Sequence, residues 1–254
     1  MADIAATLQR YGDLWALDRA RFVAECYHVD AQTEFPGMGS YQGHGELLER
    51  EQLRYRLAPD QVLVPIRWLS AGLAAVVECR VTGRSAVDVT RMSVPSLLWW
   101  ELDSAGLIRR EVLQSVWPAR KIDDGRRDGP LGATDGETLS QSGYRSLAER
   151  LSETWVWEPE LARTTLYADD AEVVHLEEPD EADQNPRAWR PLAEPRRMTI
   201  IDTLGDRRTL AVRYLLDAPK NAQLEPARVL CASVFVLDDS DRIVLERRYP
   251  DLAL

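Results

Sequence analysis

Two glutamates recur towards the ends of the two halves of this sequence, each beside a pair of arginines. Glu111 follows Arg109-Arg110, and Glu246 precedes Arg247-Arg248. A carboxylate beside a guanidinium can form an ion pair on the surface, or it can activate a water molecule in a site. Because neighbouring opposite charges are most often solvated, we interpret both glutamates as surface residues.

His175 is the side chain whose ordinary pKa, about 6.5, best suits proton transfer near neutral pH. It follows Val173 and Val174 and precedes Leu176, in an apolar run that is typical of a strand. It is therefore either a general base in a half-buried site or a strand residue whose ring is satisfied by hydrogen bonds. The sequence leaves both interpretations open.

The residue spacing gives no support to metal or phosphate chemistry. The three histidines are far apart, and none has a second histidine four residues away. Neither common type of glycine-rich phosphate-binding loop is present. We therefore expect no cofactor.

Cys26, Cys79 and Cys231 stand singly among apolar residues, which predicts buried, reduced thiols in a cytoplasmic protein.

The composition supplies enough apolar material for packed cores. Of the 254 residues, 45% are hydrophobic and eight are tryptophans. The apolar runs are far shorter than the roughly 20 residues of a membrane helix, and the first residues lack the pattern of a signal peptide. A net charge of −11 argues against a nucleic-acid partner, because binding phosphates needs a concentrated basic face.

The sequence repeats itself on either side of residues 119–141, a glycine-rich segment that we interpret as a flexible linker. The matches keep their order at a shift of 140 residues and later of 135: Trp15 with Trp155, Asp18 with Glu158, Tyr27 with Tyr167, Ile108 with Ile243, and Glu111 with Glu246. The repeat predicts two domains, residues 1–118 and 142–254, the second being a divergent copy.

Each copy has helical patterns first and long strands afterwards. In the first copy we expect helices near 4–15, 19–27 and 46–57, a short strand after Asp30, and strands over 61–69, 74–82, 89–102 and 107–116. In the second we expect helices near 144–155 and 159–167, a short strand after Asp170, and strands over 198–204, 209–216, 228–237 and 242–249. This order predicts an α+β fold whose helices pack on one curved antiparallel sheet.

Several segments of the first copy resemble the SnoaL-like branch of the nuclear transport factor 2-like superfamily. They are Tyr11-Gly-Asp-Leu-Trp-Ala-Leu-Asp18, Tyr27-His-Val-Asp-Ala31, Phe35-Pro-Gly-Met-Gly-Ser-Tyr-Gln-Gly43 and Leu102-Asp-Ser-Ala-Gly-Leu-Ile108. The resemblance covers most of residues 4–117 and is weaker over 144–251. It implies two tandem cone-shaped α+β barrels, each with three N-terminal helices (fewer in the second copy), around an apolar cavity.

The resemblance also implies chemistry, since many members are cofactor-free enzymes: ketosteroid isomerases, polyketide cyclases, scytalone dehydratase, dehydrochlorinases and epoxide-opening cyclases. Others only bind ligands or partners. Asp18 corresponds to an aspartate that pairs with a catalytic histidine in the dehydratase branch, and Glu158 takes its place in the second copy. The partner histidine is missing from residues 57–61, and His175 lies near the position of the ketosteroid isomerase base. The alternative is that Asp18 and Glu158 only cap the helices that follow them.

Large apolar side chains at corresponding positions predict the lining of the cavities. Trp100 and Phe235 share a register, and other side chains of this kind lie near them in the expected fold. The predicted lining consists of Trp15, Phe35, Tyr55, Leu98, Trp100, Trp155 and Phe235. The alternative for each is an ordinary place in the core.

We therefore expect a cofactor-free acid–base enzyme that acts on a hydrophobic, oxygenated small molecule, as natural-product biosynthesis requires. The reaction would be a cyclisation, isomerisation, dehydration or epoxide opening. The alternative is a non-catalytic binding or scaffolding protein of the same fold. We also expect the two domains to pack as an intramolecular pseudo-dimer, and whether the chain forms a further homodimer stays open.

Overall fold

The structure, a computed structural model, describes residues 3–35, 39–87, 91–115, 147–154, 158–175, 197–206, 208–217 and 228–250. The chain divides into two units, residues 1–135 and 136–254. The predicted linker, residues 119–141, lies outside the described residues. The domain limits at 118 and 142 and the packing of the domains as a pseudo-dimer stay predictions.

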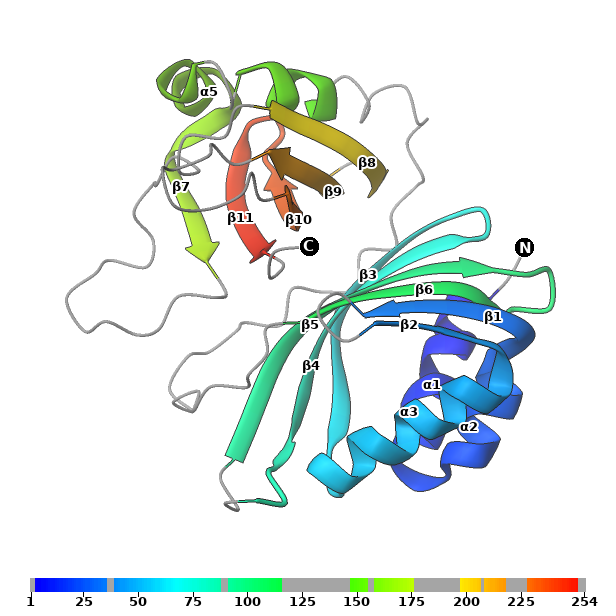
Figure 1. Ribbon diagram of the computed structural model, residues 1–254. Helices are drawn as coiled ribbons and strands as arrows, with labels where there is room; N and C mark the ends of the chain where they lie inside the picture. The colour runs from blue at the N-terminus through cyan, green and yellow to red at the C-terminus, as the bar shows by residue number, and fades with distance from the viewer. Residues whose placement is uncertain are drawn as a thin grey trace. The chain divides into compact units, whose positions relative to one another are not determined.

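Three helices cover one face of the first sheet: α1 (Ile4–Leu17), α2 (Arg19–Cys26) and α3 (Gly43–Leu57) (Figure 1). Asp3 caps the start of α1, since its carboxylate accepts a hydrogen bond from the backbone nitrogen of Ala6 at 3.0 Å. Its apolar residues at helical spacing are buried against the sheet: Ile4, Leu8, Tyr11 and Trp15. The three helices predicted for the first copy are thus confirmed.

Six strands form the first sheet, in the order β2-β1-β6-β5-β4-β3. Their bounds are β1 (Tyr27–Phe35), β2 (Gly39–Gln42), β3 (Val62–Ala71), β4 (Ala74–Arg84), β5 (Arg91–Leu102) and β6 (Ile108–Ser115). Strands β3 to β6 form an antiparallel meander that curves around the helices (Figure 1). The main core lies between this inner face and the helices.

The predicted curved antiparallel sheet is confirmed except at one pairing, which is parallel. Strand β1 runs parallel to β6, with Thr33 opposite Glu111. The chain forms β1 and β2, continues through α3, and then returns to the sheet as the meander of β3 to β6. The last strand of the meander, β6, lies beside β1 and runs in the same direction. Strand β2, which the sequence did not predict, pairs antiparallel with β1.

Helix α3 begins three residues earlier than predicted because Gly43 makes the turn from β2. Gly43 has φ +71°, and a side chain there would meet the carbonyl oxygen of Val29 at 3.3 Å. The backbone nitrogen of Gln42 donates to the Glu46 carboxylate at 2.7 Å, which closes the first turn of the helix.

The second unit has the same arrangement with five described strands, in the order β7-β11-β10-β9-β8. Residues 147–154 are helical, and α5 (Pro159–Leu166) leads into β7 (Tyr167–His175). The meander consists of β8 (Arg197–Gly205), β9 (Thr209–Asp217), β10 (Arg228–Leu237) and β11 (Ile243–Pro250). Strand β7 again runs parallel to the last strand. Whether the second copy has fewer helices depends in part on residues 176–196, outside the described residues.

The two sheets match each other in register as well as in strand order. Trp100 lies opposite Glu111 between β5 and β6, and Phe235 lies opposite Glu246 between β10 and β11. The bulge at Glu101/Leu102 in the first sheet recurs at Val236/Leu237 in the second. These positions differ by 135 residues, which equals the shift between the matched residues in this part of the repeat.

The hairpin before the last strand is also duplicated. The Asp103 carboxylate accepts from the backbone nitrogens of Ala105 and Leu107 at 2.8 and 2.9 Å. The Asp238 carboxylate accepts from those of Ser240 and Arg242 at 2.8 and 2.9 Å. The residue with positive φ is Gly106 in the first hairpin and Asp241 in the second, both of which tolerate the left-handed region.

Candidate functional site

Helix α3 places three charged residues on the same face as the buried Leu47. Arg50, Glu51 and Arg54 follow Leu47 at the spacing of an apolar face. Arg50 donates from Nε to Glu51 Oε1 at 2.9 Å, and Arg54 donates from Nε to Glu51 Oε2 at 2.8 Å. A second nitrogen of each guanidinium contacts the same oxygen. Each oxygen of the fully buried Glu51 is thus held by one arginine.

Both guanidinium groups also stack on aromatic rings. The central carbon of Arg50 lies 3.9 Å from the ring centre of Phe35, and that of Arg54 lies 3.6 Å from the ring centre of Trp15. Stacking and ion pairing together fix the plane of each guanidinium. The two cations therefore have a set orientation before any ligand binds.

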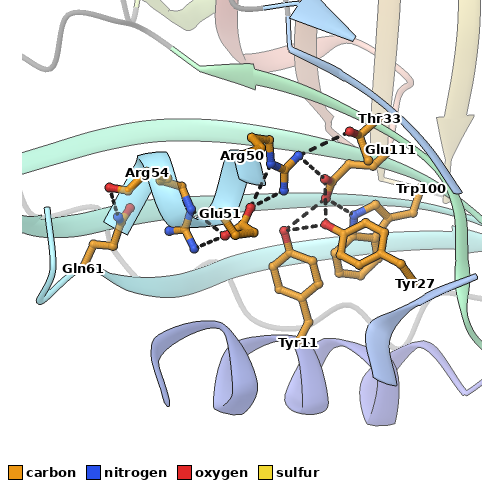
Figure 2. Close-up of polar contacts among 9 residues, drawn as sticks. All are labelled: Tyr11, Tyr27, Thr33, Arg50, Glu51, Arg54, Gln61, Trp100 and Glu111. Carbon is orange, nitrogen blue, oxygen red and sulfur yellow. Dashed lines mark hydrogen bonds and ion pairs between the residues drawn. The ribbon is translucent and has the colours of Figure 1, made fainter. Parts of the chain in front are cut away.

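Glu111 extends this row of charges into the core. Tyr11, Tyr27 and Trp100 donate hydrogen bonds to its carboxylate at 3.1, 2.8 and 2.9 Å. Nη1 of Arg50 lies 3.6 Å from Oε2 of Glu111. Figure 2 shows the four charged side chains in the order Arg54, Glu51, Arg50 and Glu111, with alternating sign.

The second unit buries the corresponding glutamate with a different cation. Tyr167 donates to Glu246 Oε2 at 2.8 Å, as Tyr27 does to Glu111. Arg248, two residues further along the same strand, donates to the two oxygens of Glu246 at 2.7 and 3.0 Å. The interpretation of Glu111 and Glu246 as surface residues is therefore wrong, because both are fully buried and hydrogen-bonded.

The surroundings shift the pKa values of these groups. Burial raises the pKa of the Tyr11 and Tyr27 hydroxyls well above the usual value, and the Glu111 carboxylate raises it further. Burial alone would raise the pKa of Glu51, but Arg50 and Arg54 lower it below its usual value. The tyrosines therefore remain hydrogen-bond donors, and Glu51 remains an anion with little tendency to accept a proton.

A cavity of about 330 Å³ adjoins the arginine end of this row. Its wall combines apolar side chains with two guanidinium groups, one amide and two hydroxyls: Trp15, Phe35, Arg50, Leu53, Arg54, Leu57, Ala58, Gln61, Val81, Val94, Ser96, Leu113 and Ser115. Leu53 and Leu57 on α3 are 42% and 43% exposed, so they form part of the rim. The volume is in the range of small-molecule sites.

One nitrogen of Arg54 has no hydrogen-bond partner within the described part of the chain. Nε and Nη2 face Glu51, while Nη1 is buried and unpaired, on the edge of the guanidinium turned towards Gln61 (Figure 2). The Gln61 amide donates to the carbonyl oxygens of Arg54 and Ala58 at 3.1 and 2.9 Å, which fixes the end of α3. A buried N–H without an acceptor is costly, so an acceptor from a ligand would stabilise it.

Asp18, the candidate catalytic residue of the first unit, is not among the described residues that line this cavity. Asp18 joins α1 to α2, and its carboxylate accepts from the backbone nitrogen of Arg21 at 3.0 Å, as the capping alternative predicted. Glu158 precedes α5 and is exposed, with no side-chain cap hydrogen bond. His175 lies at the end of β7, opposite Arg248, and its side chain lies outside the described residues.

The predicted lining residues fall into three groups. Trp15 and Phe35 line the cavity. Leu98, Trp100 and Phe235 are packed in the two cores, as the alternative for each stated. Tyr55 is 38% exposed, with the guanidinium of Arg19 stacked 3.2 Å from its ring centre, and Trp155 lies outside the described residues.

Sequence reasoning missed Arg50, Glu51 and Arg54. The signal was their spacing from Leu47, which puts three charges on the face of α3 that packs inward. Charges at such positions are buried only when they are paired. The three cysteines are buried, as predicted.

No protein-family model matches the sequence, and no curated protein matches it. The structure is similar to that of a candidate SnoaL-like polyketide cyclase from Jannaschia sp. CCS1, 17% identical, which covers 44% of this chain and 83% of its own, with a TM-score of 0.40. It is also similar to that of IdmH, a candidate polyketide cyclase from Streptomyces antibioticus, 13% identical, which covers 44% of this chain and 91% of its own, with a TM-score of 0.41. A third similar structure is an NTF2-like protein from Burkholderia pseudomallei, 15% identical, which covers 44% of this chain and 90% of its own, with a TM-score of 0.40. The first of these proteins is described as SnoaL-like and the third as NTF2-like. Each of the three matches covers 44% of this chain.

None of the described helices is long and apolar enough to cross a membrane. Within the same part of the chain, no group of three histidine, cysteine or acidic side chains could hold a metal ion.

Proposed function

We propose that the first unit binds a hydrophobic, oxygenated small molecule and acts on it as a cofactor-free enzyme of the cyclase or isomerase type. The observation that supports this proposal is an apolar cavity of about 330 Å³ whose wall contains the oriented guanidinium of Arg54. A pocket that is mostly apolar, with a few fixed polar groups, is typical of small-molecule sites.

The guanidinium of Arg54 suits a reaction in which negative charge develops on an oxygen. Ring closure by an enolate, enolisation and epoxide opening all have this character. A donor that is already fixed by Glu51 and Trp15 stabilises such an oxyanion without having to reorganise during the reaction. Arg54 would therefore act as the electrophilic group.

The wall also limits the reactions that are supported. Among the described side chains that line the cavity, none is a carboxylate, an imidazole or a phenol. Glu51 is a poor proton acceptor because two arginines hold its oxygens. These observations favour an intramolecular ring closure or isomerisation, in which the substrate or a bound water moves the proton.

The same absence of a general base from the described lining favours a second candidate function, the non-catalytic binding of the same kind of molecule. The two functions predict different fates for the ligand. An enzyme converts its ligand into an isomer or a dehydrated product, whereas a binding protein releases it with its mass and retention unchanged.

The test incubates the purified chain with a small-molecule extract of its own cells and follows all compounds by mass spectrometry. The proposal predicts one compound that is converted by the natural sequence and at least about tenfold more slowly by Arg54→Met. Arg56→Met is the matched control, because Arg56 is exposed on the same helix and does not line the cavity. A compound that is retained unchanged would support the binding function, and no bound or converted compound would contradict both.

A further inference from the structure

The charges around the cavity are arranged so that cations face it. Arg50 and Arg54 belong to its wall. Glu51 and Glu111, which balance them, have no solvent-exposed surface and do not line the cavity. A ligand in the cavity therefore meets the positive ends of the ion pairs first, although the whole chain carries a net charge of −11.

The row of alternating charges ends at the cavity with a cation. In Figure 2 the order is Glu111, Arg50, Glu51 and Arg54, so the next group in the alternation would be negative. At the opposite end of the row, the Glu111 carboxylate is satisfied, because it accepts hydrogen bonds from Tyr11, Tyr27 and Trp100. At the cavity end, Nη1 of Arg54 is buried without an acceptor in the described part of the chain.

The orientation of Arg54 determines where a negatively charged ligand atom can bind. Two of its nitrogens are engaged by Glu51, and its central carbon lies over the Trp15 ring, 3.6 Å from the ring centre. The edge that carries Nη1 is the one that Glu51 leaves unpaired. Because Nη1 itself has no exposed surface, a ligand atom reaches it only when a neighbouring side chain of the wall shifts. An oxygen in the plane of this edge makes a charge-assisted hydrogen bond, about twice as strong as one between neutral groups.

We infer that the ligand of this cavity is an organic anion, with an apolar body held by the aliphatic wall and a carboxylate or ionised enol oxygen bound by Arg54. This inference rests on the proposed function and names its substrate class. The apolar body would contact Leu57, Val94 and Leu113, and the charged oxygen would lie at the end of α3. A neutral molecule of the same shape would leave Nη1 of Arg54 unpaired.

The test compares two probes of nearly equal shape by isothermal titration calorimetry: 2-naphthoate, which is anionic at pH 7, and 2-naphthamide, which is neutral. We expect 2-naphthoate to bind about tenfold more tightly or better, as a charge-assisted hydrogen bond predicts. Arg54→Met should bind both probes within about threefold of each other, and Arg54→Lys should keep part of the preference. Arg56→Met should behave like the natural sequence, and thermal unfolding checks that each variant is folded.

A second pair of probes distinguishes the source of the anionic oxygen. 2-Hydroxy-1,4-naphthoquinone is an ionised enol at pH 7, and its 2-methoxy ether is neutral. A preference for the anion in either pair supports the inference, and the pair that shows it identifies the oxygen. If neutral and anionic members bind equally well, the inference is wrong while the proposed pocket stands. If none of the four probes binds, the proposed function fails as well.

Discussion

Tyr27 donates its hydroxyl hydrogen to Glu111 Oε2 at 2.8 Å, and neither residue is exposed to solvent. Tyr167 and Glu246 make the same hydrogen bond at 2.8 Å in the second unit. In each unit the tyrosine opens the first strand and the glutamate lies on the last strand, which run parallel. The buried tyrosine–glutamate pair therefore belongs to the duplicated architecture, while the arginine that neutralises it differs between the copies.

Replacing the buried carboxylate should destabilise the fold. In Glu111→Gln, the new amide group would face the hydroxyls of Tyr11 and Tyr27 and the indole of Trp100, which already act as donors. We expect the free energy of unfolding to fall by about 2–4 kcal/mol, measured by urea denaturation. Glu101→Gln is the control, because Glu101 is 62% exposed in its ion pair with Arg110 and should change stability by less than about 0.5 kcal/mol. Equal effects of the two substitutions would contradict the account.

The two units offer a rescue experiment for the cation. Arg248 occupies in the second sheet the position that Leu113 occupies in the first, since Ser233 pairs with Arg248 and Leu98 with Leu113. We expect Arg50→Met to lower the free energy of unfolding by about 3 kcal/mol, because Glu51 and Glu111 lose a buried partner.

Adding Leu113→Arg to Arg50→Met should restore at least half of that loss, since an arginine at 113 can reach Glu111 as Arg248 reaches Glu246. Leu113→Arg alone, with Arg50 still present, is the control and should be destabilising. If the double variant is no more stable than Arg50→Met, an arginine at position 113 does not neutralise Glu111 as Arg248 neutralises Glu246.

Asp18 should behave as a helix cap. Asp18→Ala should lower the free energy of unfolding by about 1 kcal/mol, and Asp18→Asn should leave it nearly unchanged, because asparagine also caps well. Both variants should bind 2-naphthoate as the natural sequence does. If Asp18→Asn is stable but binds at least tenfold more weakly or turns over at least tenfold more slowly, Asp18 takes part in the site and is more than a helix cap.

The buried tyrosines predict a loss of stability at high pH. Burial raises the pKa of Tyr27 in the folded chain, so above about pH 10 the unfolded chain has released a proton that the folded chain still holds. Its contribution to stability is complete below about pH 10 and is lost as the pH rises towards the raised pKa, by at most about 1.4 kcal/mol per pH unit. Urea denaturation between pH 8 and 11.5 should show a shallower decline for Tyr27→Phe. Tyr55→Phe, at an exposed position, should follow the natural sequence; identical slopes for all three would count against the burial of Tyr27.

The repeat and the meander were predictable because they depend on local patterns. Ile4, Leu8 and Tyr11 recur at helical spacing, and the turn after Asp103 repeats after Asp238. The parallel pairing of β1 with β6 was not predictable, because it joins segments about 80 residues apart and has no local signature.

The site was harder to predict because its contacts are distant in the sequence. The donors to Glu111 include Tyr11 and Tyr27, which lie 100 and 84 residues away. The arginines beside Glu111 suggested a solvated segment, yet Arg110 points to Glu34 and Glu101 on the sheet while Glu111 points inward. The alternation of sides along a strand separates neighbours that look alike in the sequence.

The most direct test of the central claim is a crystal structure of the chain with bound 2-naphthoate. We expect a carboxylate oxygen within hydrogen-bond distance of Arg54 Nη1, with the rings between Leu57 and Leu113 inside the cavity. Naphthoate outside the cavity, or inside it with its carboxylate turned away from Arg54, would contradict the account.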